Sequence, residues 1–512
     1  MSRRKHQIES LFRHGSQLHA AGRLAEAEAA YRQVLLAVPR HAGSLHMLGV
    51  LALQSGQADA ALELIAQAIA VRPAEAIYHV NRATALLAKG AAEEAAAACR
   101  HALSLKRNSA EACQVLGHAL ADLRRPEEAV AAYRDALRWN PGLPDLHNDL
   151  GLALRHAGRQ DEATTVLREA VARAPNDTHA LANLAGVLKE LRRLDEAESL
   201  YRRALALGPD DPAQHYNLSL LLLLEGRSSE GWREYAWRFQ AGAAVIPDAA
   251  QPRWQGEPLA GRTLLIRAEQ GLGDAIQFCR FAPLVGDGEV ILEVHRPLGR
   301  LLGSLGGIGR VTRMGDELPR FDLQAPLLDL PGLLGGLGAP VPYLAADPER
   351  VAKWRDRVGE QGLRVGVAWQ GNPASPAELG RSYPLAQLRP LADVPGIRLI
   401  SLQRHDGLEQ LGSLPDGLRI ETLGDDLDAG PDAFIDTAAA MQNLDLVITS
   451  DTSVAHLAGA LGRPVWVALQ HVPDWRWLLD GEECPWYPTM RLFRQSRRGD
   501  WAGVFARMAS QL

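Results

Sequence analysis

Residues 117–151 read GHALADLRRPEEAVAAYRDALRWNPGLPDLHNDLG, and this stretch starts and ends on equivalent positions of a 34-residue repeat. A small residue recurs at that position through the first half of the chain, at Gly15, Gly49, Ala83, Gly117, Gly151, Ala185 and Ser219. A turn column follows with the same period, at Gly22, Gly56, Gly90, Arg124, Gly158, Arg192 and Gly226. A fixed period of this length predicts stacked helical pairs.

Each column has a mechanical role in a pair of antiparallel helices. Small residues let two helices approach closely, and glycine permits a tight turn between them. Proline is expected to end the second helix of most units, at Pro39, Pro73, Pro141, Pro175 and Pro209, with Arg107 as the exception. Apolar columns on both helices are expected to bury one continuous core between neighbouring units.

The period and its columns resemble the tetratricopeptide repeat family, with seven units from about residue 8 to residue 242. The resemblance implies a superhelical solenoid whose concave groove, lined by the first helix of each pair, binds a peptide or protein. One column of that helix reads Arg13, Met47, Asn81, Val115, Asp149, Asn183 and Asn217.

This column resembles the asparagine ladder of the protein O-GlcNAc transferases, where amides hold an acceptor polypeptide. An amide both donates and accepts a hydrogen bond, so it can hold a peptide backbone of any sequence. Candidate acceptor-binding residues are therefore Asn81, Asp149, Asn183 and Asn217. The alternative is that asparagine is merely tolerated on a solvated concave face.

Beyond residue 242 the sequence changes from a helical repeat to a different pattern. Residues 243–262 are rich in Ala, Pro, Gly and Gln and predict a linker after a capping helix. Short β-rich runs are then separated by helical segments such as 275–284; the predicted strands are 263–267, 290–294, 363–369, 398–402, 444–449 and 464–469. This rhythm predicts an α/β half of two Rossmann-like lobes, 263–348 and 349–512, with a cleft between them.

Ligands of open parallel sheets bind beyond the carboxyl ends of strands, so the loops there are candidate sites. The first loop, EQGLGD at 269–274, could present backbone N–H groups to an anion or sugar, although Asp274 could simply cap a helix. The second loop runs from Gln370 to Pro384 and contains Arg381, which could neutralise a diphosphate.

The third loop, TSDTSVAH at 449–456, places hydroxyls and N–H groups where a helix begins, which suits a phosphate. The alternative is a capping box with a buried, structural His456. Two other patterns predict structure rather than chemistry: Asp426 and Asp428 have D-x-D spacing without a preceding strand, and the aromatic run 473–477 is typical of a core or lobe interface.

Two motifs together resemble the ADP-heptose:lipopolysaccharide heptosyltransferase family: Gly-Leu-Gly-Asp274, and Asp451-Thr-Ser-Val-Ala-His456 followed by Gly462-Arg-Pro464. The resemblance covers roughly residues 263–512 and implies the GT-B fold. With repeats in front, the chain is similar in plan to bacterial repeat-containing protein glycosyltransferases, including those of flagellin. It implies inverting, metal-independent transfer of a sugar from a nucleotide-activated donor to a protein.

The resemblance also implies roles for single residues. Asp274 is the candidate base, and the residues expected to bind the nucleotide sugar are Gly271, Gly273, Gln370, Gly371, Asn372, Arg381, Ser382, Gln403, Asp451, Thr452, Ser453 and His456. The family's Asp-Thr-Gly reads Asp451-Thr-Ser453 here, and its Gly-Pro-Thr turn is replaced by Gln470-His-Val-Pro473. The sugar therefore need not be heptose. No metal or other cofactor is expected.

Composition excludes several classes of protein. The chain has 512 residues and a formal net charge of -6, which argues against a general nucleic-acid binder. Its four cysteines form no C-x-x-C pair and predict neither a disulfide framework nor a structural zinc site. The most apolar window, 218–224, is far shorter than the ~20 residues of a membrane span. We expect a cytoplasmic protein without a signal peptide.

Two other functions remain open. The chain could be a non-catalytic scaffold, since tetratricopeptide arrays commonly act as adaptors. It could also be an enzyme that glycosylates lipopolysaccharide or another glycan, in which case the repeats would not be needed for acceptor use.

Overall fold

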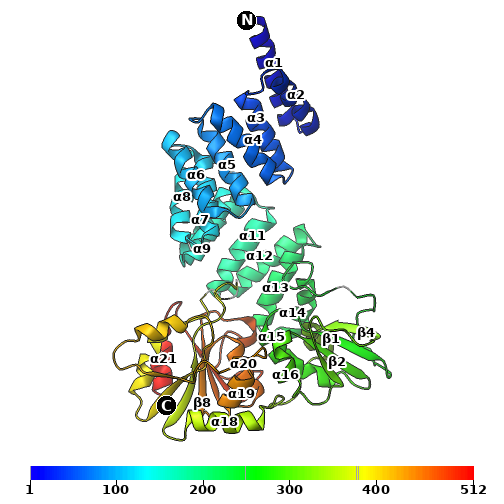
Figure 1. Ribbon diagram of the computed structural model, residues 1–512, viewed down its shortest axis with the longest axis vertical. Coiled ribbons are helices and arrows are strands. Elements are labelled where there is room, and N and C mark those ends of the chain that lie inside the picture. Colours follow the sequence, from blue (N-terminus) through cyan, green and yellow to red (C-terminus); the bar gives the residue numbers. More distant parts are fainter. Residues whose placement is uncertain (1, 144, 248, 376–377, 379) are drawn as a thin grey trace. The chain divides into compact units, whose positions relative to one another are not determined.

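The computed structural model describes residues 2–143, 145–247, 249–375, 378 and 380–512, and the chain divides into two compact units (Figure 1). One unit ends at Leu207 and the other begins at Gly208. The boundary therefore falls at the end of the sixth predicted repeat, directly after α12, so the seventh and last helical pair lies in the second unit.

The first unit is a stack of antiparallel helical pairs, visible in blue and cyan in Figure 1. The helices are α1 Ser2–Ala20, α2 Leu24–Ala37, α3 Ala42–Gln54, α4 Ala58–Val71, α5 Ala76–Ala88, α6 Ala92–Leu105, α7 Ala110–Asp122, α8 Pro126–Trp139, α9 Leu146–His156, α10 Gln160–Arg173, α11 Thr178–Glu190 and α12 Leu194–Leu207. The predicted helical pairs are confirmed, and second helices end two residues before the proline column.

The turn column adopts one backbone conformation throughout. Its glycines have positive φ angles, 73° at Gly22 and 79° at Gly158 for example, and the two arginines share the conformation, with φ of 56° at Arg124 and 58° at Arg192. The left-handed region is open to glycine at little cost. The repeat geometry is strong enough to impose the same turn on two L-residues that rarely adopt it.

The small-residue column sits where paired helices touch. A Cβ placed on Gly117 would lie 2.4 Å from a ring carbon of Tyr133, and one on Gly151 would lie 2.4 Å from Cγ of Leu167. In both cases the partner stands 16 positions further on, on the second helix of the pair. A large buried side chain therefore fills the space that the glycine leaves.

Gly117→Ala is expected to lower the free energy of unfolding of the first unit by about 1–3 kcal/mol, because the new methyl group overpacks against Tyr133. Gly142→Ala is the matched control, since a Cβ there would meet only Oδ1 of Asn140, at 3.5 Å. Urea unfolding followed by far-UV circular dichroism measures both. Equal stability of the two variants would contradict the close approach of α7 and α8.

The second unit begins with the last helical pair, α13 Pro212–Leu224 and α14 Ser228–Tyr235, followed by the short helix η1 Ala236–Arg238. The predicted linker beyond it is ordered in its described part: Trp254 is buried, and its N–H donates to the carbonyl of Gln324 at 2.8 Å. The linker therefore packs along a strand of the first sheet.

The first sheet has four parallel strands in the order β3-β2-β1-β4. The strands are β1 Thr263–Arg267, β2 Glu289–Val294, β3 Arg310–Arg313 and β4 Leu323–Pro326. Between them lie α15 Leu272–Phe278, η2 Cys279–Leu284, η3 Arg296–Leu298 and α16 Gly299–Leu302, and after β4 come η4 Leu327–Asp329 and α17 Leu330–Leu334.

The second sheet has six parallel strands in the order β10-β9-β8-β5-β6-β7. The strands are β5 Leu363–Ala368, β6 Ile397–Ser401, β7 Ile420–Thr422, β8 Leu446–Ser450, β9 Val465–Leu469 and β10 Met490–Arg494. The accompanying helices are α18 Pro348–Val358, η6 Leu385–Asp393, η7 Leu408–Ser413, α19 Ile435–Met441, α20 Ser453–Ala460, η8 Trp475–Trp477 and α21 Trp501–Ala509.

The six predicted strands are confirmed within two residues, but β3, β4, β7 and β10 were not predicted. Each of these is short or carries charges or proline: β3 reads RVTR, and β4 ends in Pro326. The segment 275–284 is not one helix, because the α-helix changes to 3-10 geometry at Cys279, four residues before Pro283.

Candidate functional site

The predicted loops lie where the strand order of each sheet reverses. In the second sheet, β5 and β8 are neighbours, and the chain proceeds outward from them in opposite directions. In the first sheet, β1 lies between β2 and β4 and meets the same condition. Ligand crevices of open parallel sheets form at such switch points, at the carboxyl ends of the strands. The loops after β1, β5 and β8 are therefore well placed to bind a ligand.

The starts of α15 and α20 face each other closely. A Cβ placed on Gly273 would lie 3.1 Å from Cδ2 of His456 and 3.4 Å from Cα of Ser453. A side chain at 273 would therefore require the ring of His456 to shift. The structure thus brings together the Gly-Leu-Gly-Asp274 loop and the loop at 451–456, which are almost 180 residues apart in sequence.

Asp274 uses both carboxylate oxygens. Its Oδ2 accepts the N–H of Gly271 at 2.8 Å, and its Oδ1 accepts a hydrogen bond from Nη2 of Arg476. The N-cap of α15 is Gly271, so Asp274 is not the N-cap itself; it is the third helical residue and accepts the N–H of the N-cap, as in a capping box. The same carboxylate also forms an ion pair with Arg476. The side chain of Asp274 keeps 18% of its surface exposed, so a ligand can still reach it.

Arg476 is the centre of a row of alternating charges that joins the two sheets. Its Nη1 donates to Oδ1 of Asp474 at 2.8 Å, and the other oxygen of Asp474 accepts from Nη2 of Arg381 at 2.7 Å. Nε of Arg381 lies 3.4 Å from Oδ2 of Asp451. The row therefore runs Asp274, Arg476, Asp474, Arg381, Asp451, and we call it the charge row.

Burial and charge shift the pKa values of this row in different directions. Burial raises the pKa of Asp451. Burial alone would also raise the pKa of Asp474, but the charges of Arg476 and Arg381 outweigh it and hold that pKa below its usual range. The neighbouring carboxylates in turn raise the pKa of Arg476 despite its burial. Both arginines therefore stay charged.

His456 is buried and neutral. Its ring stacks on Trp477 with 5.2 Å between centroids, and its Nδ1 lies 3.2 Å from the hydroxyl of Tyr487. Burial lowers the pKa of His456 to about 3. The buried histidine of the alternative interpretation is confirmed, but Thr452, the N-cap of α20, makes no side-chain capping bond, so the capping box of that interpretation is wrong.

The pKa of His456 predicts a pH dependence of stability. The folded-state pKa lies below the unfolded value of about 6.5, so this stabilisation is present above pH 6.5 and is lost as the pH falls from 6.5 towards 3, by roughly 1.4 kcal/mol per pH unit. His456→Gln is expected to flatten the pH dependence of unfolding between pH 6.5 and 5, followed by tryptophan fluorescence. The exposed His179→Gln is the control, and identical slopes for both variants would refute a neutral buried His456.

The described part of the second loop is held by hydrogen bonds, several of them from Gln403, which follows β6. Oε1 of Gln403 accepts the N–H groups of Trp369 and Gln370, at 3.0 and 3.1 Å, and its Nε2 donates to the carbonyl of Gln370 at 2.8 Å. The side-chain amide of Gln403 is thus used to fix the end of β5. The N–H of Gly371 donates to Oγ of Ser382 at 2.9 Å, and Asn372 accepts from Ala374 within an exposed turn.

In the third loop, the side chain of the N-cap residue Thr452 makes no hydrogen bond to the first turn of α20. Oγ1 of Thr452 lies 3.3 Å from Oγ1 of Thr449 rather than on the first turn of α20. Ser453 is the first residue of α20 and is partly exposed. Gly273 approaches this turn, because a Cβ placed on it would lie 3.4 Å from Cα of Ser453.

The asparagine column ties neighbouring repeats together. Nδ2 of Asn183 donates to Oδ1 of Asn148 at 2.8 Å, and Oδ2 of Asp149 accepts from Nε2 of Gln114 at 3.1 Å. Asn81 pairs in the same way with Nε2 of His46, at 2.7 Å. Each pair spans 35 positions, so the side chains of Asn81, Asp149 and Asn183 each already make one hydrogen bond within the array. The fourth residue of the column, Asn217, is partly buried on α13 in the second unit.

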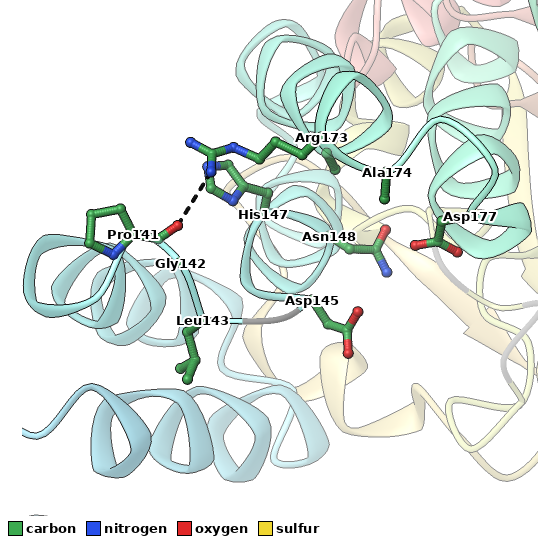
Figure 2. A pocket seen from close by; sticks show the side chains of 10 residues that line it. Pro141, Gly142, Leu143, Asp145, His147, Asn148, Arg173, Ala174 and Asp177 are labelled. Atoms are coloured by element: carbon green, nitrogen blue, oxygen red, sulfur yellow. Dashed lines mark hydrogen bonds between the residues drawn. The ribbon is translucent and has the colours of Figure 1, made fainter.

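A pocket of about 290 Å³ lies in the first unit where the α8–α9 connection meets the end of α10 (Figure 2). Nη1 of Arg173 lies 3.5 Å from the carbonyl of Pro141, and Asp177 accepts the N–H of His179 at 2.9 Å as the cap of α11. These polar groups of the pocket therefore already form hydrogen bonds within the helical array. Among the residues described there, none is a predicted acceptor-binding residue.

The D-x-D pair has a structural role, as expected. Asp426 forms ion pairs with Lys353 and Arg357, at 3.3 and 2.8 Å, while Asp428 accepts the N–H of Asp436 at the start of α19. In the part of the chain that the structure describes, no cluster of His, Cys, Asp and Glu has the arrangement of a metal site. None of the described helices has both the length and the apolar character needed to span a membrane.

Sequence reasoning missed Arg476 and Asp474. The aromatic run 473–477 is typical of a core or lobe interface, and Trp475 and Trp477 are indeed buried. Two opposite charges alternating with these aromatic residues were the available signal, because buried charges require partners. Arg238 was missed for a similar reason: it is wholly buried behind the first loop.

Comparison with known proteins identifies the repeats. One tetratricopeptide repeat family model matches residues 46–111 and 115–178, and a second matches residues 154–221. Protein FlbA of Caulobacter vibrioides (strain ATCC 19089 / CIP 103742 / CB 15) is 32% identical over 324 residues, which are 57% of this chain and 53% of that protein. The chain thus spans about half the length of this curated relative.

Two solved structures are similar to part of the chain. Pseudomonas aeruginosa pilF is 18% identical with a TM-score of 0.38, covering 47% of this chain and 99% of that one. A tetratricopeptide protein of Thermus thermophilus is 26% identical with a TM-score of 0.32, covering 36% and 99%. The family matches and the helical pairs together show that residues 46–221 form tetratricopeptide repeats.

Proposed function

We propose that the chain is a glycosyltransferase that moves a sugar from a nucleotide-activated donor to a protein held by the tetratricopeptide array. One observation carries this proposal: Asp274, at the switch point of the first sheet, is joined through Arg476 to the switch point of the second sheet. A carboxylate on one side of a crevice and cationic and N–H groups on the other are what transfer from a diphosphate donor requires.

In the proposed reaction Asp274 accepts the proton of an acceptor hydroxyl. The hydroxyl oxygen forms a bond to the anomeric carbon while the bond from that carbon to the diphosphate oxygen breaks, which inverts the configuration. The leaving diphosphate would be stabilised by Arg381 and by the N–H groups at the start of α20. These groups can carry its charge, so the proposal requires no metal ion.

The same proposal assigns the GT-B arrangement to the two parallel sheets and a cytoplasmic location to the protein. Support comes from the resemblance of the Asp274 and Asp451 loops to the heptosyltransferases and from the switch-point position of both loops. The tetratricopeptide array would supply the protein acceptor, which makes lipopolysaccharide or a free glycan the less favoured substrate.

A scaffold without catalysis is the second candidate, and a specific observation favours it. Each guanidinium of the charge row already pairs with carboxylates, and the row of three aspartates and two arginines carries a net negative charge. A diphosphate must then displace a carboxylate from Arg381. In the scaffold interpretation these pairs would only hold the two sheets together.

A thermal-shift screen of the purified full chain against nucleotide sugars and free nucleotides separates the two candidates. A ligand that binds the folded state raises its unfolding temperature by mass action. A shift with one donor, followed by its turnover, supports the transferase. Binding of no donor or nucleotide would favour the scaffold.

Arg381→Gln is expected to weaken the binding of the nucleoside diphosphate by roughly 10- to 100-fold, because a charge-assisted hydrogen bond to phosphate is lost. Isothermal titration calorimetry with the diphosphate found in the screen measures this. The control is Arg389→Gln, since Arg389 forms an exposed ion pair with Asp393 and is expected to bind normally. Unchanged affinity in Arg381→Gln would show that Arg381 only stabilises the charge row and does not bind the diphosphate.

A further inference from the structure

The last helical pair shares its core with the two sheets. Leu223 and Leu224 of α13 and Tyr235 of α14 belong to the same buried cluster as strands β1, β2 and β8. Helices α1–α7 of the first unit form separate clusters of their own. By packing, α13 and α14 therefore belong to the half of the chain that contains the candidate site.

Arg238, at the end of this pair, is wholly buried behind the first loop. Its Nη2 donates to Oε1 of Glu269 at 2.8 Å and to Oδ1 of Asp329 at 2.6 Å. Glu269 directly precedes the Gln-Gly-Leu-Gly turn, and its carboxylate also accepts the N–H groups of Leu327 and Leu328 after β4. The start of the Asp274 loop is thus attached, through one guanidinium, to η1, which directly follows α14.

Tyr235 holds the next residue of the loop. Its hydroxyl lies 2.9 Å from Nε2 of Gln270 and 3.2 Å from Oε1. Gln270 has a φ angle of 64°, a conformation that L-residues rarely adopt and that surrounding contacts must maintain. Its carbonyl accepts from Nε2 of His295 at 3.0 Å. Tyr235 therefore holds the side chain of Gln270 and His295 holds its backbone carbonyl.

The same helical pair also supports Arg476. The ring of Trp475 lies 5.2 Å from that of Trp232 on α14, edge to face, and the guanidinium of Arg476 lies 4.3 Å above the Trp475 ring. A side chain that donates to Asp274 is thereby stacked on a ring that α14 fixes. Both partners that orient Asp274, the turn before it and Arg476, rest on the last helical pair.

We propose that the last helical pair, α13 and α14, is a positioning element of the candidate site, with Tyr235 and Arg238 as the residues that orient the Asp274 loop. The pair has the repeat's sequence pattern but serves the transferase half instead of extending the polypeptide-binding stack. The expected effect on kcat rests on the proposed function, whereas the effect on the Asp274 loop can be measured by hydrogen exchange without it.

The test uses Tyr235→Phe in the full chain, which keeps the ring packing and removes only the hydroxyl. Amide hydrogen exchange is expected to become about 10-fold faster for residues 270–272, with the unfolding temperature nearly unchanged. If the wild type turns over a donor, kcat is expected to fall about 10-fold with the donor KM unchanged. Tyr31→Phe, which loses the hydroxyl contact to Ser16 in the first unit, is the matched control.

Arg238→Lys is the second variant, because it keeps the charge but not the fork that reaches both Glu269 and Asp329. The amide hydrogens of residues 270–272 are expected to exchange faster in this variant than in Tyr235→Phe. Exchange and kcat in both variants equal to those of Tyr31→Phe would overturn the proposal. If the wild type turns over no donor, the proposed function fails, and the exchange of residues 270–272 alone then supports or overturns the positioning role.

Discussion

Asp274→Asn is expected to lower the rate of sugar transfer by about 100- to 10,000-fold while leaving the affinity for the donor nearly unchanged. The amide cannot accept the proton of an acceptor hydroxyl. Its single oxygen can still receive the N–H of Gly271 or the guanidinium of Arg476, so the loop should remain folded. Steady-state kinetics gives the rate, and calorimetry with the nucleoside diphosphate gives the affinity.

The control for this variant is Asp347→Asn. Asp347 caps α18 through the N–H groups of Glu349 and Arg350, so the same change is made at a helix start away from the charge row. Its turnover is expected to equal that of the wild type. Full turnover in Asp274→Asn would remove Asp274 from the role of base and would leave the charge row with a structural role only.

The repeats could be predicted because each column follows from local geometry. A turn that needs positive φ and a contact that excludes Cβ leave their marks in the sequence, at Gly22 and Gly117 for example. The strands 263–267 and 363–368 could be predicted for the same reason, since buried parallel strands are continuous apolar runs. Polar edge strands such as β3 carry no such mark.

The partners of the site residues could not be predicted, because they depend on pairing between distant elements. The sequence placed Asp274 and Asp451 in loops after strands, but nothing local indicates that Arg476 reaches Asp274 across 202 positions. The asparagine column shows the same limit. Asn183 pairs with Asn148, one position out of the column, which a comparison of equivalent positions does not detect.

Arg476→Met is expected to lower the free energy of unfolding of the second unit by about 3–5 kcal/mol, because it leaves Asp274 without its cation and takes from Asp474 one of its two arginine partners. Arg476 donates to Asp274, to Asp474 and to Oε1 of Gln277, so its removal breaks contacts to both sheets at once. Denaturant unfolding followed by tryptophan fluorescence is the measurement. Ten of the 11 tryptophans lie beyond residue 207, so the signal reports the second unit.

The control is Arg296→Met, which removes an exposed ion pair with Asp316 and is expected to cost less than about 1 kcal/mol. A double-mutant cycle with Asp274→Asn then isolates the contact between the sheets. Once Asp274 is neutral, part of the penalty for losing Arg476 disappears, so a coupling of about 1–3 kcal/mol is expected. Additive effects would mean that Arg476 stabilises Asp474 and Gln277 alone. In that case the two switch points would be joined by the hydrogen bond of Arg476 to Gln277 and by the close approach at Gly273, not by the ion pair with Asp274.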